Sequence, residues 1–203
     1  MHISATSIAL PLVLGLGFIP SLGSAENVRA EWLLAVSQAR QAEDQARAFD
    51  FLEGRWQIHN RRLVKRLQGS TEWQEFEAHS VCTSLPGQLG NQDAYRTDFW
   101  QGFVGLSLRF FDLQSGRWSI YWIDNRAGTL QPPVIGAFAG DAGIFEGSDQ
   151  YQGRPIRVRF TWSRVTTRHP RWEQAFSVDG GKSWETNWTM DFTRTDAAVV
   201  SSR

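Results

Sequence analysis

The chain has almost no cysteine, since only Cys82 occurs among its 203 residues. One thiol cannot form an intramolecular disulfide, and it excludes a zinc site built from several thiolates. Net charge is also lacking, because 21 lysines and arginines balance 21 aspartates and glutamates. Without a basic field, the chain has no electrostatic means to hold nucleic acid or an anionic membrane. We therefore expect a globular protein of one domain, two at most, that does not bind nucleic acid.

Long apolar runs are missing too, apart from one near the N-terminus. Residues 1–25 contain no Asp, Glu, Lys or Arg, and positions 8–19 are almost entirely apolar. This run is shorter than the roughly 20 residues of a membrane-spanning helix, and Pro11 interrupts it. The small residues Gly23-Ser24-Ala25 fit a signal-peptidase site before Glu26. The sequence predicts a signal peptide at 1–25, a mature chain without a membrane span, and a secreted or periplasmic protein.

Helix-forming residues dominate the segment that follows. Ala, Gln, Arg and Glu are frequent in residues 29–48, which contain neither Gly nor Pro. Apolar residues such as Trp32, Val36 and Ala39 recur near the spacing of a helix. We predict an N-terminal helix within 26–48. At the other end of the chain, residues 196–203 are predicted to be a disordered tail.

From residue 49 onward, apolar and polar residues alternate at the period of a β-strand. Strands are expected at 55–64, 73–83, 92–99, 104–112, 117–124, 134–139, 143–151, 155–163, 171–179 and 184–194. Turn sequences such as Asp179-Gly180-Gly181 separate them, which is typical of antiparallel sheets. A barrel is favoured because closure pairs both edge strands. We predict an all-β fold, with a single antiparallel up-and-down β-barrel of about ten strands at 49–195.

The alternation also predicts which side chains face the interior. Four tryptophans fall on that face: Trp118, Trp122, Trp162 and Trp188. Three uncharged polar residues are in phase with the apolar positions: Asn60, Gln174 and Thr186. A buried polar group costs several kcal/mol unless it is hydrogen-bonded. These three side chains are therefore either satisfied by one another and by buried water, or available to a ligand.

Two carboxylates fall in the same phase and are the candidate catalytic groups. Asp124 follows Trp122 at a strand end, where its carboxylate either caps a turn or faces the interior. Glu146 follows Ile144, and its position is ambiguous in the same way. Arg62 is expected at the rim beside Glu146. Arginines of the later strands, such as Arg157 and Arg159, fall on the opposite face, where they form either cross-strand pairs in solvent or an arginine-lined anion site, and we favour the pairs.

The first and last strands carry a resemblance to lipocalins. Gly54-Arg55-Trp56 resembles the Gly-x-Trp entry of the lipocalin first strand, and Arg194 stands where lipocalins place an Arg that packs over that Trp. A guanidinium over an indole face gains about 0.5–2 kcal/mol. The resemblance implies that Gly54, Trp56 and Arg194 close one end of the barrel.

The runs RWSIYWID and RWEQAFSVDGGKSWETNWTMDFTR resemble an uncharacterised group of bacterial β-barrels related to the calycins, over about residues 49–194. The resemblance implies a calycin-like barrel with an internal cavity and no settled activity. Nitrobindin-like barrels, which also have ten strands, bind haem through a His near the last strands, and residues 171–194 contain no His. We therefore expect no haem, no other cofactor and no metal.

Two further patterns concern the surface. Adjacent antiparallel strands would bring His59 close to His79 or Glu77, as a metal-binding or proton-transfer pair or as solvated surface residues. The loops within 83–95 and 125–133 contain Pro and Gly and are expected to frame the barrel mouth.

Two functions of different classes are compatible with this interior. We favour an exported protein that binds a small, largely apolar or aromatic ligand in a Trp-lined cavity. The alternative is an enzyme on the same barrel, such as an isomerase, cyclase or hydratase, with Asp124 or Glu146 as its acid–base group. A barrel filled by its own ten tryptophans, with its function on the surface, is a third possibility. No feature of the sequence indicates an oligomeric state.

Overall fold

The computed structural model describes residues 25–195. The predicted signal peptide, apart from Ala25, and the predicted tail at 196–203 lie outside the described residues. The chain divides after Gln38 into two compact units. The first contains the start of helix α1 (Ala25–Ala46), and the second contains its end and all ten strands. No helix within residues 25–195 is long and apolar enough to cross a membrane.

The second unit is built from ten strands, and the N-terminal helix precedes them as predicted. The strands are β1 (Gly54–Leu63), β2 (Trp73–Ser84), β3 (Gly90–Thr97), β4 (Phe103–Asp112), β5 (Arg117–Asp124), β6 (Val134–Ala139), β7 (Ala142–Tyr151), β8 (Arg154–Ser163), β9 (Arg171–Ser177) and β10 (Glu185–Arg194). Short 3-10 helices, η1 (Asp50–Leu52) and η2 (Pro86–Gln88), precede β1 and β3. The observed bounds of each strand lie within two residues of the predicted ones.

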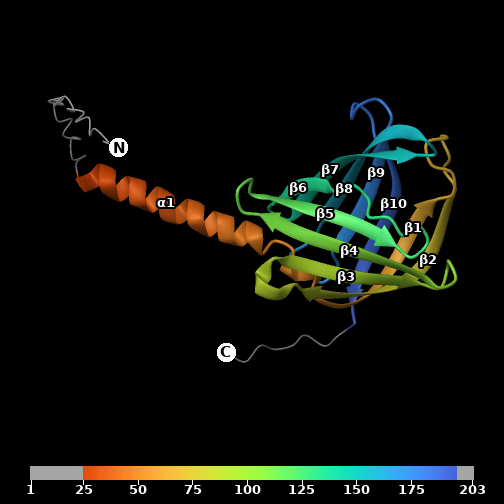
Figure 1. Cartoon of the computed structure of the whole chain (residues 1–203), viewed down its shortest axis with the longest axis horizontal. Helices are drawn as coiled ribbons and strands as arrows, with labels where there is room; N and C mark the ends of the chain where they lie inside the picture. The colour runs from red at the N-terminus through yellow and green to blue at the C-terminus, as the bar shows by residue number, and fades with distance from the viewer. Residues whose placement is uncertain (1–24, 196–203) are drawn as a thin grey trace, which may run out of the picture. The chain divides into compact units, whose positions relative to one another are not determined.

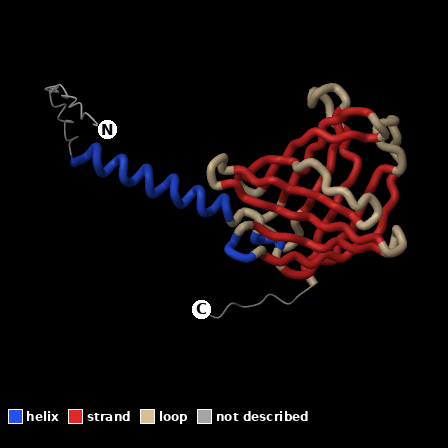
Figure 2. Tube along the Cα trace, in the orientation of Figure 1, coloured by secondary structure: helices blue, strands red, loops and turns tan. Residues whose placement is uncertain are grey.

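Each strand pairs with its neighbours in sequence, and β1 also pairs with β10, which closes the barrel (Figure 1). All of these pairs are antiparallel, and tight turns join most of the strands (Figure 2). The closing register sets Trp56 opposite Arg194 and Arg62 opposite Trp188. Closure leaves no unpaired edge. The prediction of an all-β antiparallel barrel preceded by a helix is therefore confirmed.

The predicted interior faces are correct along most strands. On β8, Ile156, Val158 and Trp162 are buried, as expected from their alternation with Arg157 and Arg159. Burial of such side chains contributes about 1.5–3 kcal/mol each. On β7, however, the prediction is wrong by one residue.

Phe145 sets the face of β7. Its side chain is fully buried, whereas Ile144 is 53% exposed. Gly143 makes room for it, because a Cβ there would lie 2.9 Å from the Phe145 ring. The residues that alternate with Phe145 face inward, so Glu146 lies on the outer face. The interior position predicted for Glu146 is therefore wrong.

The start of β10 also departs from strict alternation. The register with β9 shifts between Thr186 and Trp188, so that Asn187 is an extra residue in the strand. Such a bulge re-aims the side chains on either side of it. Asn187 is fully buried and Thr186 is exposed. The prediction that Thr186 faces the interior is therefore wrong, and Asn187 takes that place.

One end of the barrel, which we call the closed end, is where β1 begins and β10 ends. Phe49 is fully buried there, and its ring centroid lies 4.9 Å from that of Trp118 and 4.8 Å from that of Phe138. Phe145 and Trp162 complete this aromatic cluster around Phe49. Burial of these large rings contributes most of the packing energy at this end.

Arg194 covers the first-strand indole at the closed end. Its guanidinium carbon lies 4.3 Å from the ring centroid of Trp56. The Nη1 and Nη2 atoms donate hydrogen bonds to the carbonyl oxygens of Glu53 and Phe51, at 2.6 and 2.8 Å. The Trp56 indole nitrogen donates to the carbonyl of Leu52 at 2.6 Å. This contact matches the one that the lipocalin resemblance implied for Trp56 and Arg194, and Gly54 precedes it at the start of β1.

Candidate functional site

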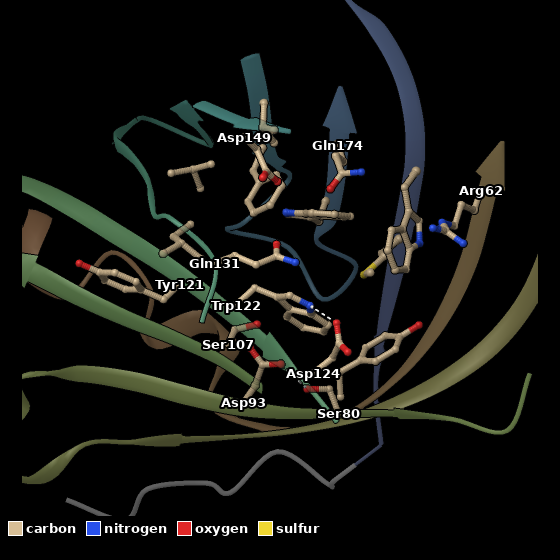
Figure 3. Close-up of a pocket in the computed structure, with 18 of the residues that line it drawn as sticks. Arg62, Ser80, Asp93, Ser107, Tyr121, Trp122, Asp124, Gln131, Asp149 and Gln174 are labelled. Atoms are coloured by element: carbon tan, nitrogen blue, oxygen red, sulfur yellow. Dashed lines mark hydrogen bonds between the residues drawn. The ribbon is translucent and has the colours of Figure 1, made fainter. Parts of the chain in front are cut away.

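A cavity extends from the closed end toward the other end of the barrel, which we call the open end (Figure 3). Its volume is about 450 Å³. Pockets for small molecules usually occupy about 300–1,000 Å³. Six tryptophans line it: Trp56, Trp100, Trp122, Trp162, Trp172 and Trp188. The ten tryptophans of the chain therefore do not fill the barrel.

Three of the four tryptophans predicted as stacking walls, Trp122, Trp162 and Trp188, are brought together in the cavity. Trp118 faces the interior but does not line the cavity. It packs in the closed-end cluster, and its indole nitrogen donates to the carbonyl of Gln45 at the end of α1, at 2.8 Å. Alternation alone could not separate these positions, because it predicts the face of a strand and not the depth along the barrel.

Asn60 faces the interior as predicted, but its polar atoms bond to protein. Its Oδ1 accepts hydrogen bonds from the Tyr95 hydroxyl and the Trp188 indole nitrogen, both at 3.0 Å. Its Nδ2 donates to the carbonyl of Ile58. Asn60 thus holds two cavity-lining rings in place and is not itself a lining residue.

Gln174 lines the cavity, and its amide nitrogen donates to Oδ1 of Asn187 at 2.8 Å. Asn187 was missed by the sequence analysis because the bulge in β10 is invisible to a pattern of period two. Thr186, which was expected beside Gln174, lies outside the barrel and does not join this group.

The two candidate catalytic carboxylates do not share a site. Asp124 lines the cavity, but its Oδ1 accepts hydrogen bonds from the backbone nitrogens of Arg126 and Ala127, at 2.9 and 2.8 Å. Its Oδ2 lies 3.3 Å from the Trp122 indole nitrogen, the bond drawn in Figure 3. Glu146 forms ion pairs with Arg157 and Arg159 on the outer face, at 3.2 and 2.7 Å.

A buried ion pair in the cavity wall was also missed. Asp93 on β3 pairs with Arg109 on β4, and Asp93 accepts a hydrogen bond from the Ser80 hydroxyl. Arg109 also donates to Asn91 at 3.1 Å, and its guanidinium lies over the Phe49 ring. The available signal was a pair of opposite charges on neighbouring strands. Asp93 lies two residues from Tyr95 and is therefore in the same phase of β3.

Cys82 lines the same part of the cavity. Burial raises the pKa of its thiol to about 12, so the sulfur is protonated at neutral pH. A protonated thiol is a poor nucleophile and a poor metal ligand. Cys82 therefore serves as an apolar wall.

The mouth of the cavity lies at the open end. Arg126, Gln131 and Pro132 from the loop between β5 and β6 line it, as expected for 125–133. The loop between β2 and β3, within 83–95, does not line the mouth. Successive connections of an up-and-down barrel alternate between its two ends, so this loop lies at the closed end. Its neighbour Asn91 instead donates a hydrogen bond to the carbonyl of Phe49 at the closed end. That part of the expected mouth is wrong.

His59 lies on the outer face of β1, beside two carboxylates of β2. Its Nδ1 is 2.8 Å from Glu77 and its Nε2 is 3.5 Å from Glu75. His79 lies opposite Gln57 in the register and does not join them. Within residues 25–195, no group of three or more His, Cys, Asp or Glu side chains could hold a metal ion.

Comparison with known proteins adds no family to this description. No protein-family model and no curated protein matches the chain. The ten-stranded antiparallel barrel, with its Arg over the first-strand Trp, is consistent with a calycin-like fold.

Proposed function

We propose that this protein binds a small, largely apolar or aromatic molecule in the Trp-lined cavity of its barrel. The observation that carries the proposal is the cavity itself, a space of about 450 Å³ among six indole rings. A core without a ligand would gain free energy by filling such a space with side chains, because interiors normally pack to crystal-like density. Flat aromatic walls suit a planar or apolar guest.

The cavity walls are held in place before any ligand binds. Trp188 and Tyr95 both donate to Asn60. The Trp122 ring lies against Gly105, where a Cβ would come within 2.0 Å of it. A site whose side chains are already ordered loses less entropy on binding than one that must form around its ligand. The geometry therefore supports binding more than it supports a structural core.

An enzymatic role is supported less well. Asp124 is the one predicted acid–base group in the cavity. Its Oδ1 accepts hydrogen bonds from the turn after β5, and its Oδ2 accepts one from the Trp122 indole nitrogen. A general base needs an oxygen within reach of the proton that it removes. We retain binding as the proposed function.

The proposed place of action is outside the cytoplasm, after export. The support is the apolar, uncharged segment at 1–25 with its small residues before Glu26. N-terminal sequencing of the protein secreted or released from the periplasm tests this directly. A first residue at Glu26 is expected, and retention of the segment in a cytoplasmic fraction would contradict export.

Fluorescence titration with the neutral apolar dye N-phenyl-1-naphthylamine tests the cavity. We expect saturable enhancement at one dye per chain. Trp122→Ala should weaken binding by about tenfold, because it removes one stacking wall. Trp73→Ala is the matched control, since that indole lies under Arg61 on the outer face and does not line the cavity. Equal loss in both variants, or no saturable binding to the folded wild type, would overturn the proposal.

Native mass spectrometry of the protein purified without refolding looks for the natural ligand. We expect an adduct that leaves on denaturation, with a mass compatible with the cavity. The same adduct should be depleted in Trp122→Ala and retained in Trp73→Ala. An adduct that is retained equally in both variants would place it outside the cavity.

A further inference from the structure

Among the charged residues that line the cavity, Arg62 has a buried donor without a hydrogen-bond partner. It extends from β1 in phase with Ile58 and Asn60, and it lines the cavity near the open end (Figure 3). Its guanidinium carbon lies 4.8 Å from the ring centroid of Trp100 and 5.0 Å from that of Trp188. The two indoles thus hold the planar group, and Trp188 is itself held by Asn60.

Within the part of the chain that the structure describes, no residue accepts a hydrogen bond from this guanidinium. Its Nε is buried and has no hydrogen-bond partner. Within residues 25–195, Arg62 forms no ion pair with an Asp or Glu. A guanidinium presents five N–H donors in a rigid fork, and burial of such donors without acceptors is costly.

The carboxylates that line the cavity are committed elsewhere. Asp93 pairs with Arg109, and Asp124 accepts bonds from the turn after β5. Asp149 accepts a hydrogen bond from the backbone nitrogen of Gln150 at 2.7 Å. None of the three neutralises Arg62.

A second cation adds to this positive charge. Arg66 also lines the cavity, with its guanidinium 4.5 Å from the ring centroid of Tyr151. Burial, followed by the charge of Arg66, lowers the pKa of Arg62 to about 10. Arg62 is therefore still protonated at neutral pH. An anion that enters the cavity would meet a positive charge that the protein leaves uncompensated.

From these contacts we propose that Arg62 anchors the carboxylate of an aromatic acid whose ring lies among the cavity tryptophans. The inference rests on the proposed function and names the chemical class of its ligand. A carboxylate matches the guanidinium fork with two parallel hydrogen bonds, which adds orientation to charge attraction. The Trp100 and Trp188 rings, perpendicular to each other and 5.9 Å apart, both contact the guanidinium and restrict its orientation, so that little conformational entropy remains to be lost.

A pair of probes of equal shape isolates the charge. 2-Naphthoate and 2-naphthamide differ only in the carboxylate and its uncharged amide counterpart, and each can displace N-phenyl-1-naphthylamine from the cavity. We expect the wild type to bind 2-naphthoate at least about tenfold more tightly than 2-naphthamide at pH 7. Arg62→Gln should abolish this preference and leave the affinity for 2-naphthamide within about threefold. Arg62→Lys should retain part of the preference, because the charge remains and the fork is lost.

Arg61→Gln is the matched control. Arg61 is adjacent in sequence but lies on the outer face, paired with Glu75 at 3.0 Å. Its replacement should leave both affinities unchanged, and circular dichroism should show all variants folded. A preference for 2-naphthoate that survives in Arg62→Gln would overturn the assignment to Arg62.

The two proposals fail in different ways. If the dye and both naphthalene probes bind but the wild type does not distinguish acid from amide, the anion site is wrong and the apolar binding site stands. If neither the dye nor the two probes bind to the folded wild type, the proposed function is wrong, and the inference about Arg62 is wrong as well.

Discussion

The two ends of the barrel use the same contact, an arginine over a tryptophan, in opposite ways. At the closed end, Arg194 covers Trp56 and donates to two backbone carbonyls. At the open end, Arg62 lies against Trp100 and Trp188 with a buried Nε that lacks an acceptor. The contact between guanidinium and indole is alike at both ends. The other donors differ, because those of Arg194 have carbonyl acceptors and the Nε of Arg62 has none. The difference indicates that cation–π contacts alone do not reveal a role, whereas unused donors in a cavity point to a ligand.

The aromatic residues at the two ends also differ in role, since some pack a core and others line the cavity. At the closed end, rings pack directly against Phe49. At the open end, rings of similar kind enclose a cavity. Substitutions at the closed end should therefore act on stability, and substitutions at the open end should act mainly on binding.

The largest effect is expected for Phe49→Ala. This change empties the centre of the closed-end cluster and should lower the free energy of unfolding by about 3–5 kcal/mol. Urea denaturation followed by tryptophan fluorescence measures it. The dye affinity of the remaining folded protein should change little. A loss below about 1 kcal/mol would show that the cluster around Phe49 does not carry the stability of this end.

A second prediction compares the two arginines directly. Arg194→Gln removes charge-assisted hydrogen bonds to the carbonyls of Glu53 and Phe51 and should cost about 2–3 kcal/mol of stability. Arg62→Gln should change the free energy of unfolding without ligand by less than about 1 kcal/mol, because it removes no hydrogen bond and because removal of a buried unpaired donor offsets the lost indole contacts. Urea midpoints of the two variants measure the contrast. Equal costs would break the distinction between a structural and a binding arginine.

A smaller effect is expected from Gly105→Ala, which acts on the cavity wall. The added methyl would lie 2.0 Å from the Trp122 ring, so the indole must move. Overpacking of this kind costs about 1–3 kcal/mol. Dye affinity should fall together with stability, as measured by titration and thermal unfolding. Gly102→Ala has open space around its Cβ, but Gly102 has a φ of 68°, so this control should lose some stability without loss of affinity.

The smallest effect concerns Cys82, which lies opposite Gly54 near the closed end. Because burial raises its thiol pKa to about 12, little thiolate exists at pH 8 in the folded protein. Iodoacetamide should alkylate it far more slowly in the native state than in urea, where the thiol pKa returns to about 8.5. Mass spectrometry of timed samples measures the ratio. Equal rates would place the thiol in solvent and contradict its position in the cavity wall.

The sequence predicted the strands well because their signals are local. Alternation of apolar and polar residues determines a strand and its inward face, as for Ile156 and Val158 on β8. Turn residues such as Gly180, with a φ of 77°, mark the ends of strands because they adopt conformations that other residues avoid. Closure then followed from the need to pair the edge strands.

The candidate site was predicted in part. Trp122, Trp162, Trp188 and Gln174 share one cavity, as expected from their phase. Trp118 was not separated from them because depth along the barrel depends on the arrangement of strands around it. Thr186 and Glu146 were misplaced by a bulge and by a one-residue error of phase, and neither leaves a local signature in the sequence.

By itself, the sequence determined that this chain forms a closed antiparallel barrel with tryptophans inside, because strand period and turn chemistry are properties of neighbouring residues. Only the tertiary structure decided which rings pack solidly and which enclose a cavity. It also decided that Asp93 meets Arg109 whereas Arg62 meets no carboxylate within the described residues. The physical reason is that a charge is compensated by what lies near it in space, and register and closure bring together residues far apart in the chain.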